Sequence, residues 1–197
     1  MMAARAMEGA GPAAPSTAVP HSNPGSMMTY ASAVAVRPAA PDDGPAITAI
    51  YNEGIRGRTA TFETRARTPD EVRGWLGDPP HPVLVAEAEG RVAGWVAAST
   101  YRPRECYAGI AEFSVYVAAD ARGRRVGDAL LAAFLPACEA AGLWKVLSRI
   151  FPENVASRRL CARHGFREVG TYHRHGRLDG AWRDVVIVER LLGEAAG

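Results

Sequence analysis

The apolar positions of residues 34–192 recur either at every second residue or at every third or fourth, which is typical of strands and of amphipathic helices. A first helix is expected after residue 42, with Asp42 or Asp43 as its cap. Its apolar face is formed by Ala46, Ile47, Ile50, Tyr51 and Ile55. A short second helix is predicted to begin at Thr68, because the run Thr-Pro-Asp-Glu has the residues of a capping box.

Strands and helices alternate through the rest of this region. Strands are expected at 34–38, 82–87, 91–98, 110–117, 144–151, 166–173 and 183–191, with turns at Glu89-Gly90 and Asp179-Gly180. Helices are expected at 124–141, with Pro136 inside, and at 154–164. One passage, from strand 110–117 through helix 124–141 to strand 144–151, has the form of a parallel crossover. The pattern therefore predicts an α+β domain with a mixed, mostly antiparallel central sheet flanked by helices.

The first 33 residues lack this pattern. Seventeen of residues 1–28 are Ala, Gly, Pro or Ser, and none is Leu, Ile, Phe, Trp or Tyr. Such a segment cannot bury enough apolar surface to offset the entropy lost on ordering, and prolines interrupt the apolar run that a signal peptide needs. We expect a disordered extension at 1–33, in which Met27-Met28 is an alternative translation start, one domain at 34–192, and a tail at 193–197.

Composition and charge exclude several classes of protein. A formal net charge of +2 is too small to favour nucleic acid or an anionic membrane, and no run of 18 apolar residues is present. Cys106, Cys138 and Cys161 lie far apart without C-x-x-C spacing, which argues against disulfides and zinc and for a cytoplasmic location. His173 and His175 lie at strand spacing on one face but lack a third ligand, so no metal is expected.

The segment 115–128 combines a strand end, a loop rich in Gly and Arg, and a helix start. Free amides and the helix dipole favour an anion at such a place, and Arg122, Arg124 and Arg125 add positive charge. The glycine spacings of a Walker loop and of a dinucleotide-binding fold are missing. A solvated basic turn without a ligand is the alternative.

This loop resembles the R/Q-x-x-G-x-G/A motif of the Gcn5-related N-acetyltransferase (GNAT) superfamily, in which backbone amides hold the pyrophosphate of acetyl-CoA. Arg122 and Gly127 match its first and last positions, whereas Arg125 replaces the middle glycine. The resemblance implies a GNAT fold, in which the central sheet is splayed at one parallel strand pair, and acetyl-CoA as co-substrate. It also implies a backbone at residue 125 that accepts a residue other than glycine, and weaker or rearranged pyrophosphate contacts. The contacts that it implies come from Val115, Tyr116, Val117, Arg122, Gly123, Arg124, Arg125, Val126, Gly127 and Asp128.

Residues 154–166 match a second signature of the superfamily, N-x-x-S-x-x-L-x-x-x-x-G-F. The resemblance implies that Asn154 contacts acetyl-CoA near its pantetheine or sulfur and that Ser157 lies along it. An ordinary N-cap and first-turn residue are the alternative. Cys161 replaces a tyrosine that often follows the leucine and is credited with protonating the departing thiolate. A thiol with a pKa of about 8.5 can leave without such an acid.

Four further stretches resemble the phosphinothricin and arsinothricin N-acetyltransferases, and residues 51–55 and 60–63 are closer to the arsinothricin branch. They lie at 50–55, 60–63, 101–117 and 180–185. The substrates of these enzymes are glutamate analogues that end in a phosphinate or an arsinate. The resemblance implies a substrate pocket of Phe62, Arg102, Arg104, Tyr107 and Trp182, in which the two guanidinium groups hold the anion. Taken without the resemblance, Arg102, Arg104 and Glu112 are ordinary charged residues of a strand and a loop.

The acceptor's ammonium must lose a proton before it attacks a thioester, and a positioned base accelerates such a step by roughly 10²–10⁴-fold. Glu112 is the candidate base, directly or through a water, and Asn154 is the second catalytic candidate. A structural ion pair between Glu112 and an arginine across the sheet is the alternative. Backbone amides of residues 115–117 are expected to polarise the thioester carbonyl.

The sequence therefore predicts an acyltransferase that acetylates the α-amine of arsinothricin or phosphinothricin by direct transfer and confers resistance by detoxification. The resembled family forms homodimers, so a homodimer is expected. Three alternatives stay open. They are an acceptor such as methionine sulfoximine, a protein N-terminus or lysine as acceptor, and an acyl-CoA-binding module without catalysis.

Overall fold

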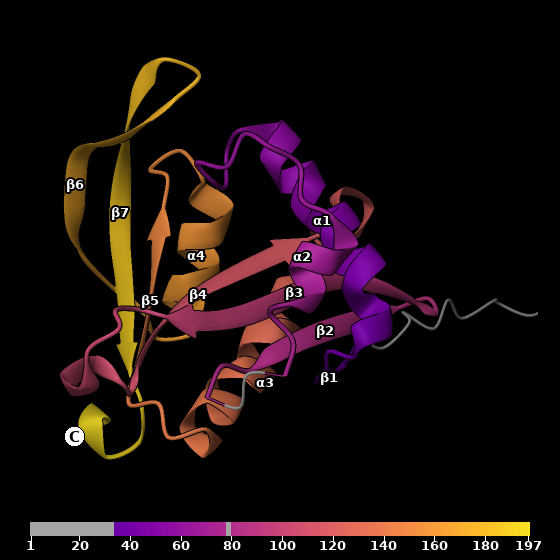
Figure 1. Cartoon of the computed structure of the whole chain (residues 1–197). Helices are drawn as coiled ribbons and strands as arrows, with labels where there is room; N and C mark the ends of the chain where they lie inside the picture. Colours follow the sequence, from indigo (N-terminus) through magenta and orange to yellow (C-terminus); the bar gives the residue numbers. More distant parts are fainter. Residues whose placement is uncertain (1–33, 78–79) are drawn as a thin grey trace, which may run out of the picture. The chain divides into compact units, whose positions relative to one another are not determined.

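Seven strands form one mixed sheet in the order β1-β2-β3-β4-β5-β7-β6 (Figure 1). The computed structural model describes residues 34–77 and 80–197, all within the unit Ser32–Gly197. The extension expected at 1–33 lies outside the described residues. Within them the elements follow the predicted order, and β4 with β5 is a parallel pair, whereas the other neighbours are antiparallel. The predicted α+β class is confirmed.

The described elements have the following bounds. The strands are β1 Ala35–Pro38, β2 Val83–Ala88, β3 Arg91–Thr100, β4 Ile110–Val117, β5 Lys145–Ile150, β6 Arg167–Leu178 and β7 Ala181–Leu191. The helices are α1 Gly44–Gly57, α2 Pro69–Arg73, α3 Val126–Ala140 and α4 Val155–Arg163. The short 3-10 helices are η1 Pro41–Asp43, η2 Glu105–Tyr107, η3 Ala119–Ala121 and η4 Gly193–Ala196, the last of which lies in the predicted tail.

Two helix caps were predicted near the N-terminus of the domain, and the structure contains one of them in full. Thr68 caps α2 as expected, because its hydroxyl accepts a hydrogen bond from Glu71 N–H and the Glu71 carboxylate accepts one from Thr68 N–H. Asp43 is the N-cap residue of α1, as expected, but its side chain makes no capping hydrogen bond to the helix. Its carboxylate instead accepts two hydrogen bonds from the Arg37 guanidinium (2.6 and 2.9 Å), which lower the pKa of Asp43. This ion pair connects β1 to the start of α1.

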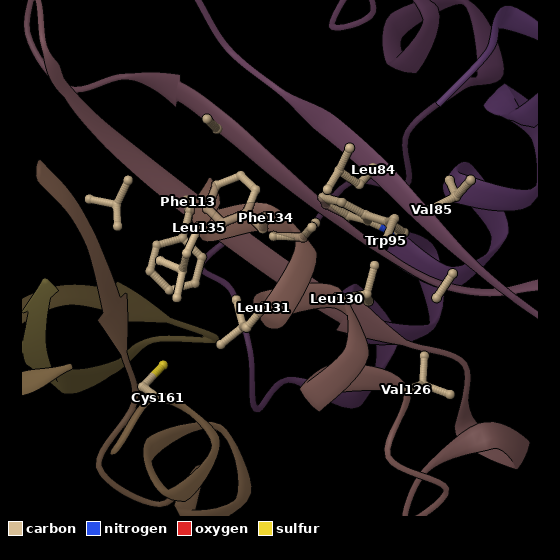
Figure 2. Close-up of a cluster of buried hydrophobic side chains, with 14 of the residues drawn as sticks. Leu84, Val85, Trp95, Phe113, Val126, Leu130, Leu131, Phe134, Leu135 and Cys161 are labelled. Atoms are coloured by element: carbon tan, nitrogen blue, oxygen red, sulfur yellow. The ribbon is translucent and has the colours of Figure 1, made fainter. Parts of the chain in front are cut away.

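Helices α1 and α3 cover opposite faces of the sheet. Successive side chains of a strand point to opposite faces, and β4 follows this rule. Phe113 packs on Phe134 of α3 with 5.7 Å between ring centroids, whereas Tyr116 packs on Tyr51 of α1 at 5.0 Å. Figure 2 shows Phe113 beside Phe134, with Cys161 of α4 in the same buried cluster. The sheet is therefore the middle of three layers.

Strands β4 and β5 separate in the middle of the sheet (Figure 1). Their parallel pairing covers Ile110–Glu112 against Lys145–Leu147, although β4 continues to Val117 and β5 to Ile150. Backbone groups beyond this point that face the opposite strand have no partner there. Unpaired backbone groups need water or a ligand as hydrogen-bond partner, so this gap between the strands is a natural binding place for a ligand.

The last hairpin is longer than predicted, because β6 continues to Leu178 instead of ending at His173. Its pairing with β7 shifts register between Tyr172 and Gly176, where Arg174 has a positive φ of 50°. This irregularity breaks the strand alternation, so the prediction that His173 and His175 share a face at regular strand spacing is wrong. His173 Nδ1 lies 2.8 Å from the Asp184 carboxylate instead.

Candidate active site

A cavity of about 50 Å³ lies where β4 and β5 diverge, and we call it the splay cavity. Its lining residues come from the segment after α1, from β4, from the end of β5 and from the start of α4. They are Ala60, Phe113, Ser114, Val115, Tyr116, Ser148, Arg149, Ile150, Phe151, Asn154 and Ser157. The cavity thus brings together two stretches with predicted cofactor contacts, Val115-Tyr116 on β4 and Asn154 with Ser157 on α4.

The backbone of β4 directs two N–H groups into the gap. Ala118 N–H donates to Ala93 O of β3 (2.9 Å), and β4 pairs with β3 along its whole length. By alternation, the N–H groups of Val115 and Val117 face β5, whereas the N–H of Tyr116 faces β3. The amides of Val115 and Val117 can therefore polarise a carbonyl in the splay cavity, and that of Tyr116 cannot.

The first turn of α3 presents amides suited to a pyrophosphate. The N–H groups of Val126, Gly127 and Asp128 have no hydrogen-bond partner in the described part of the chain, and α3 is 15 residues long. Unpaired amides at the start of such a helix favour an anion. Nearby, Arg122 Nε donates to Val117 O (3.4 Å), while the Arg124 guanidinium is engaged by Glu89. This donor set fits the diphosphate of acetyl-CoA.

Arg125 has the left-handed backbone conformation, with φ of 62° and ψ of 15°. Arginine is therefore accommodated at this position, but in a region of backbone conformation that favours glycine. The loop keeps the conformation that glycine favours, and arginine adopts it at a cost of about 1–2 kcal/mol. The amides that follow it consequently keep the path that a glycine at residue 125 would allow.

Gly127 and Asp128 connect α3 to α4. A β-carbon on Gly127 would lie 2.9 Å from Leu160 Cδ2, so α4 packs against the bare backbone of residue 127. The Asp128 carboxylate accepts two hydrogen bonds from Arg163 (2.9 and 3.0 Å), which lower the pKa of Asp128. A cofactor contact of either residue would therefore come from its backbone N–H.

Asn154 is the N-cap of α4, as the alternative interpretation expected, and it also lines the splay cavity. Its Oδ1 accepts a hydrogen bond from Ser157 N–H (3.1 Å), and its Nδ2 donates to Thr59 O (3.3 Å). The cofactor contact of Asn154 stays a prediction. Cys161, at the tyrosine position of the signature, is 1% exposed, and burial raises its pKa to about 12. It lies in the core and is not placed to protonate a leaving thiolate.

Glu112, the candidate base, is paired with Arg149 of β5. Glu112 Oε1 accepts a hydrogen bond from Arg149 Nε (2.8 Å), and Oε2 accepts one from Nη2 (2.5 Å). The pair spans β4 and β5 where their ladder ends, and the side chains are 22% and 46% exposed, respectively. The structural alternative of an ion pair across the sheet is thus observed. Both groups remain accessible to an incoming molecule.

A second cavity, of about 360 Å³, lies on the α1 side of the sheet, and we call it the aromatic cavity. Its lining residues are Tyr51, Gly74, Trp75, His81, Trp95, Ala97, Ala98, Ser99, Thr100 and Ser114. Ser114 lines both cavities, and Ser99 lies opposite Glu112 in the β3–β4 pair. Molecules in the two cavities would therefore approach the same part of β4.

The predicted anion clamp lies beside the aromatic cavity and not in its wall. Arg102 and Arg104 are exposed in the connection between β3 and β4. Their guanidinium groups lie over the rings of Tyr101 (5.2 Å) and Tyr107 (5.7 Å), respectively. Thr100, two residues before Arg102, does line the cavity. The clamp role of both arginines, and of Tyr107 beside them, stays a prediction.

Phe62 and Trp182, two of the three aromatic residues predicted for the substrate pocket, lie in different places. Phe62 packs edge-on against Phe151, a wall residue of the splay cavity, with 4.9 Å between ring centroids. Trp182 is 52% exposed near the turn of the last hairpin, with the Arg177 guanidinium 4.4 Å from its ring. Trp182 lines neither cavity. One copy of the described chain therefore places Phe62 at the site and Trp182 outside it.

Two parts of the site were not predicted. Arg149 had a local signal, because it is the one charged residue in the mostly apolar strand end Val-Leu-Ser-Arg-Ile-Phe. Trp75 and Trp95, which lie in the segment after α2 and in β3, had no such signal, and Tyr51 was predicted only as part of the apolar face of the first helix and of a stretch that resembles the family. The rings of Trp75 and Trp95 each lie 5.6 Å from that of Tyr51.

Other chemistries find little support in residues 34–77 and 80–197. No group of three or more His, Cys, Asp or Glu side chains within these ranges could hold a metal ion. Burial raises the pKa of Cys138 and of Cys161 to about 12, which disfavours the reactive thiolate. Across the same ranges, none of the helices combines the length and the apolar character that crossing a bilayer requires.

Comparison with known proteins agrees with this architecture. Residues 47–166 match the model of the acetyltransferase (GNAT) family. The chain is 40% identical over 171 residues to the phosphinothricin N-acetyltransferase of Streptomyces coelicolor, covering 84% of this chain and 100% of that protein. It is 33% identical over 161 residues to the L-methionine sulfoximine/L-methionine sulfone acetyltransferase of Pseudomonas paraeruginosa, covering 80% and 94%, respectively.

The structure is also similar to that of a GNAT superfamily phosphinothricin acetyltransferase from Sinorhizobium meliloti in complex with AcCoA. The TM-score is 0.77 and the identity 31%, over 82% of this chain and 89% of that one. A sheet that opens at its parallel pair, beside a helix start with unpaired amides, is the arrangement of an N-acetyltransferase. The chain belongs to the acetyltransferase (GNAT) family.

Proposed function

We propose that this enzyme transfers the acetyl group of acetyl-CoA to the α-amine of a small glutamate analogue, arsinothricin or phosphinothricin. Acetylation converts the α-ammonium into a neutral amide, so the product no longer presents the charge pattern of glutamate. The analogue is thereby detoxified, which confers resistance. The identity of 40% to a phosphinothricin N-acetyltransferase supports this class of acceptor. We expect the enzyme to act as a cytoplasmic homodimer.

The observation that carries the proposal is the meeting of the two cavities at Ser114. The splay cavity, at about 50 Å³, is lined by Val115 of β4, and it holds the thioester end of acetyl-CoA in this proposal. The aromatic cavity, at about 360 Å³, lies in the range of small-molecule sites. An acceptor held there can bring its amine to the thioester.

The residues of the chain have distinct proposed roles. The amides of Val126, Gly127 and Asp128, with Arg122, hold the diphosphate of acetyl-CoA, which supplies the activated acetyl group. Glu112 accepts the proton that the acceptor's ammonium releases, directly or through a water, once its pairing with Arg149 opens. The amine then attacks the thioester carbon, and the carbon–sulfur bond breaks as the amide bond forms. The second proton that the amine nitrogen must lose passes to the departing CoA sulfur, so the products are the neutral amide and the CoA thiol.

Methionine sulfoximine is a second candidate acceptor. The wall of the aromatic cavity consists of aromatic, small and hydroxyl-bearing residues together with His81, and its lining residues in the described part of the chain include no Asp, Glu, Lys or Arg. Such a wall suits an uncharged distal group. A relative at 33% identity is named an L-methionine sulfoximine/L-methionine sulfone acetyltransferase. A protein N-terminus is the third candidate.

The test is the release of free CoA thiol with purified enzyme and five acceptors, which are phosphinothricin, arsinothricin, methionine sulfoximine, glutamate and a short peptide with a free N-terminus. We expect turnover of at least one of the first three and much slower reaction with glutamate and the peptide. Ser114→Leu, which fills the junction of the cavities, should abolish turnover while acetyl-CoA still raises the melting temperature. Preferred turnover of the peptide would contradict the proposal.

A further inference from the structure

The Glu112–Arg149 pair holds two opposite charges at the end of the splay cavity. Both Glu112 oxygens accept hydrogen bonds from the Arg149 guanidinium, which is the two-pronged geometry that guanidinium groups form with carboxylates. The side chains are 22% and 46% exposed, so a solute can displace either partner. Exposed ion pairs of this kind contribute little to stability and open readily.

The pair lies between the two cavities. Arg149 lines the splay cavity, and Ser99, which lines the aromatic cavity, donates its hydroxyl hydrogen to Glu112 O (3.2 Å). The Glu112 carboxylate raises the pKa of Arg149, and Tyr101 and Tyr172 are close enough to contribute. The guanidinium therefore stays charged at the entrance that an acceptor uses.

An α-amino acid carries an ammonium and a carboxylate on one carbon, and these charges are complementary to Glu112 and Arg149. Insertion of the amino acid replaces one internal ion pair by two intermolecular ones, so neither protein charge loses its partner. We propose, resting on the proposed function, that Arg149 binds the α-carboxylate of the acceptor while Glu112 receives its α-ammonium. The acceptor's side chain then extends past Ser99 and Ser114 into the aromatic cavity.

Arg149 is in this view the residue that selects free α-amino acids. An α-carboxamide or a peptide N-terminus lacks the carboxylate and would leave the guanidinium unmatched. The distal group of the acceptor is then held elsewhere, by the aromatic cavity or by Arg102 and Arg104. Arg149 therefore discriminates between acceptors by their α-carboxylate and not by their distal group.

The experiment compares L-methionine sulfone with its α-carboxamide. The distal sulfone is uncharged in both compounds, and they differ in the α-carboxylate alone. kcat/KM is measured for wild type, Arg149→Met and Arg149→Lys. The control is Arg158→Met, which removes a similar two-pronged pair with Glu168 (2.8 and 3.1 Å) outside both cavities. Equilibrium binding of both compounds to the CoA-loaded enzyme is measured in parallel, since it does not require turnover.

Wild type and Arg158→Met should prefer the acid by about 10–100-fold, the range expected for a charge-assisted pair of hydrogen bonds. In Arg149→Met this ratio should fall to about one, because kcat/KM falls for the acid and stays unchanged for the carboxamide. Arg149→Lys should give an intermediate ratio. An unchanged ratio in a folded Arg149→Met, or equal use of acid and amide by wild type, would overturn the role of Arg149 and leave the proposed function intact. Failure of wild type to bind or acetylate any amino acid would overturn both.

Discussion

Gly127 of α3 and Leu160 of α4 lie so close that a β-carbon on Gly127 would stand 2.9 Å from Leu160 Cδ2. Gly127 belongs to the loop with the predicted pyrophosphate contacts, and Leu160 to the signature that begins at Asn154. The two motifs are thus in direct contact. Close approach of α3 to α4 helps hold Asn154 at the wall of the splay cavity.

Gly127→Val is therefore expected to destabilise the fold by about 1–3 kcal/mol, because a branched side chain, unlike the single methyl group of alanine, cannot be accommodated by a small shift of the end of Leu160. Urea unfolding measures this change. In a Leu160→Ala background the same substitution should cost much less, and equal costs in both backgrounds would contradict the packing argument. A bulky residue at 127 should also abolish the rise in melting temperature that acetyl-CoA produces.

Arg125→Gly and Arg125→Ala separate the backbone of this loop from its charge. Both remove the guanidinium, but glycine alone relieves the positive φ of 62°. We expect Arg125→Gly to be about 1 kcal/mol more stable than Arg125→Ala in urea unfolding. Equal stability of the two variants would mean that the left-handed conformation carries no strain.

Asp128→Asn tests the ion pair between α3 and α4 through its dependence on pH. Arg163 lowers the pKa of Asp128 in the folded protein, so the pair stabilises the fold above the unfolded pKa of about 3.9 and loses this effect as pH falls through the folded pKa. The variant should be about 1 kcal/mol less stable than wild type at pH 7 and equally stable near pH 2. Asp70→Asn is the control, because the Asp70 side chain is 90% exposed. A difference that persists at pH 2 would indicate another cause.

Glu112→Gln removes the proposed base while keeping its size. kcat should fall by about 10²–10⁴-fold with little change in acetyl-CoA affinity, and part of the loss should be recovered at high pH, where more of the amine is already neutral. If Glu112 only pairs with Arg149, stability and activity should fall together and the pH profile should keep its shape. A stable variant with the wild-type kcat at pH 7 would remove Glu112 from the mechanism.

Arg102→Ala and Arg104→Ala test the anion clamp. Each should lower kcat/KM for phosphinothricin or arsinothricin by about 10–100-fold, which corresponds to about 1.5–3 kcal/mol of charge-assisted hydrogen bonding. The uncharged acceptor methionine sulfone is the control and should be affected much less. Equal losses with charged and uncharged acceptors would show that the loop acts on folding and not on the anion.

The sequence by itself determined the kind and order of the elements, because those depend on neighbouring residues. Thr68 and Glu71 cap α2 across three positions, Glu89-Gly90 turns between β2 and β3, and Asn154 caps α4 through Ser157 N–H. The motif residues therefore lie on the predicted elements. The parallel pair was also predictable, since one connection in the chain has the form of a crossover.

The tertiary structure alone decided which distant side chains meet. Glu112 pairs with Arg149, Asp43 with Arg37, and Gly127 packs on Leu160. With 23 basic and 21 acidic residues, the composition leaves many pairings open, and local spacing does not choose among them. The packing of α3 and α4 beside β4 and β5 selects the pairs, because it determines where the two strands separate and which charged side chains lie at that point.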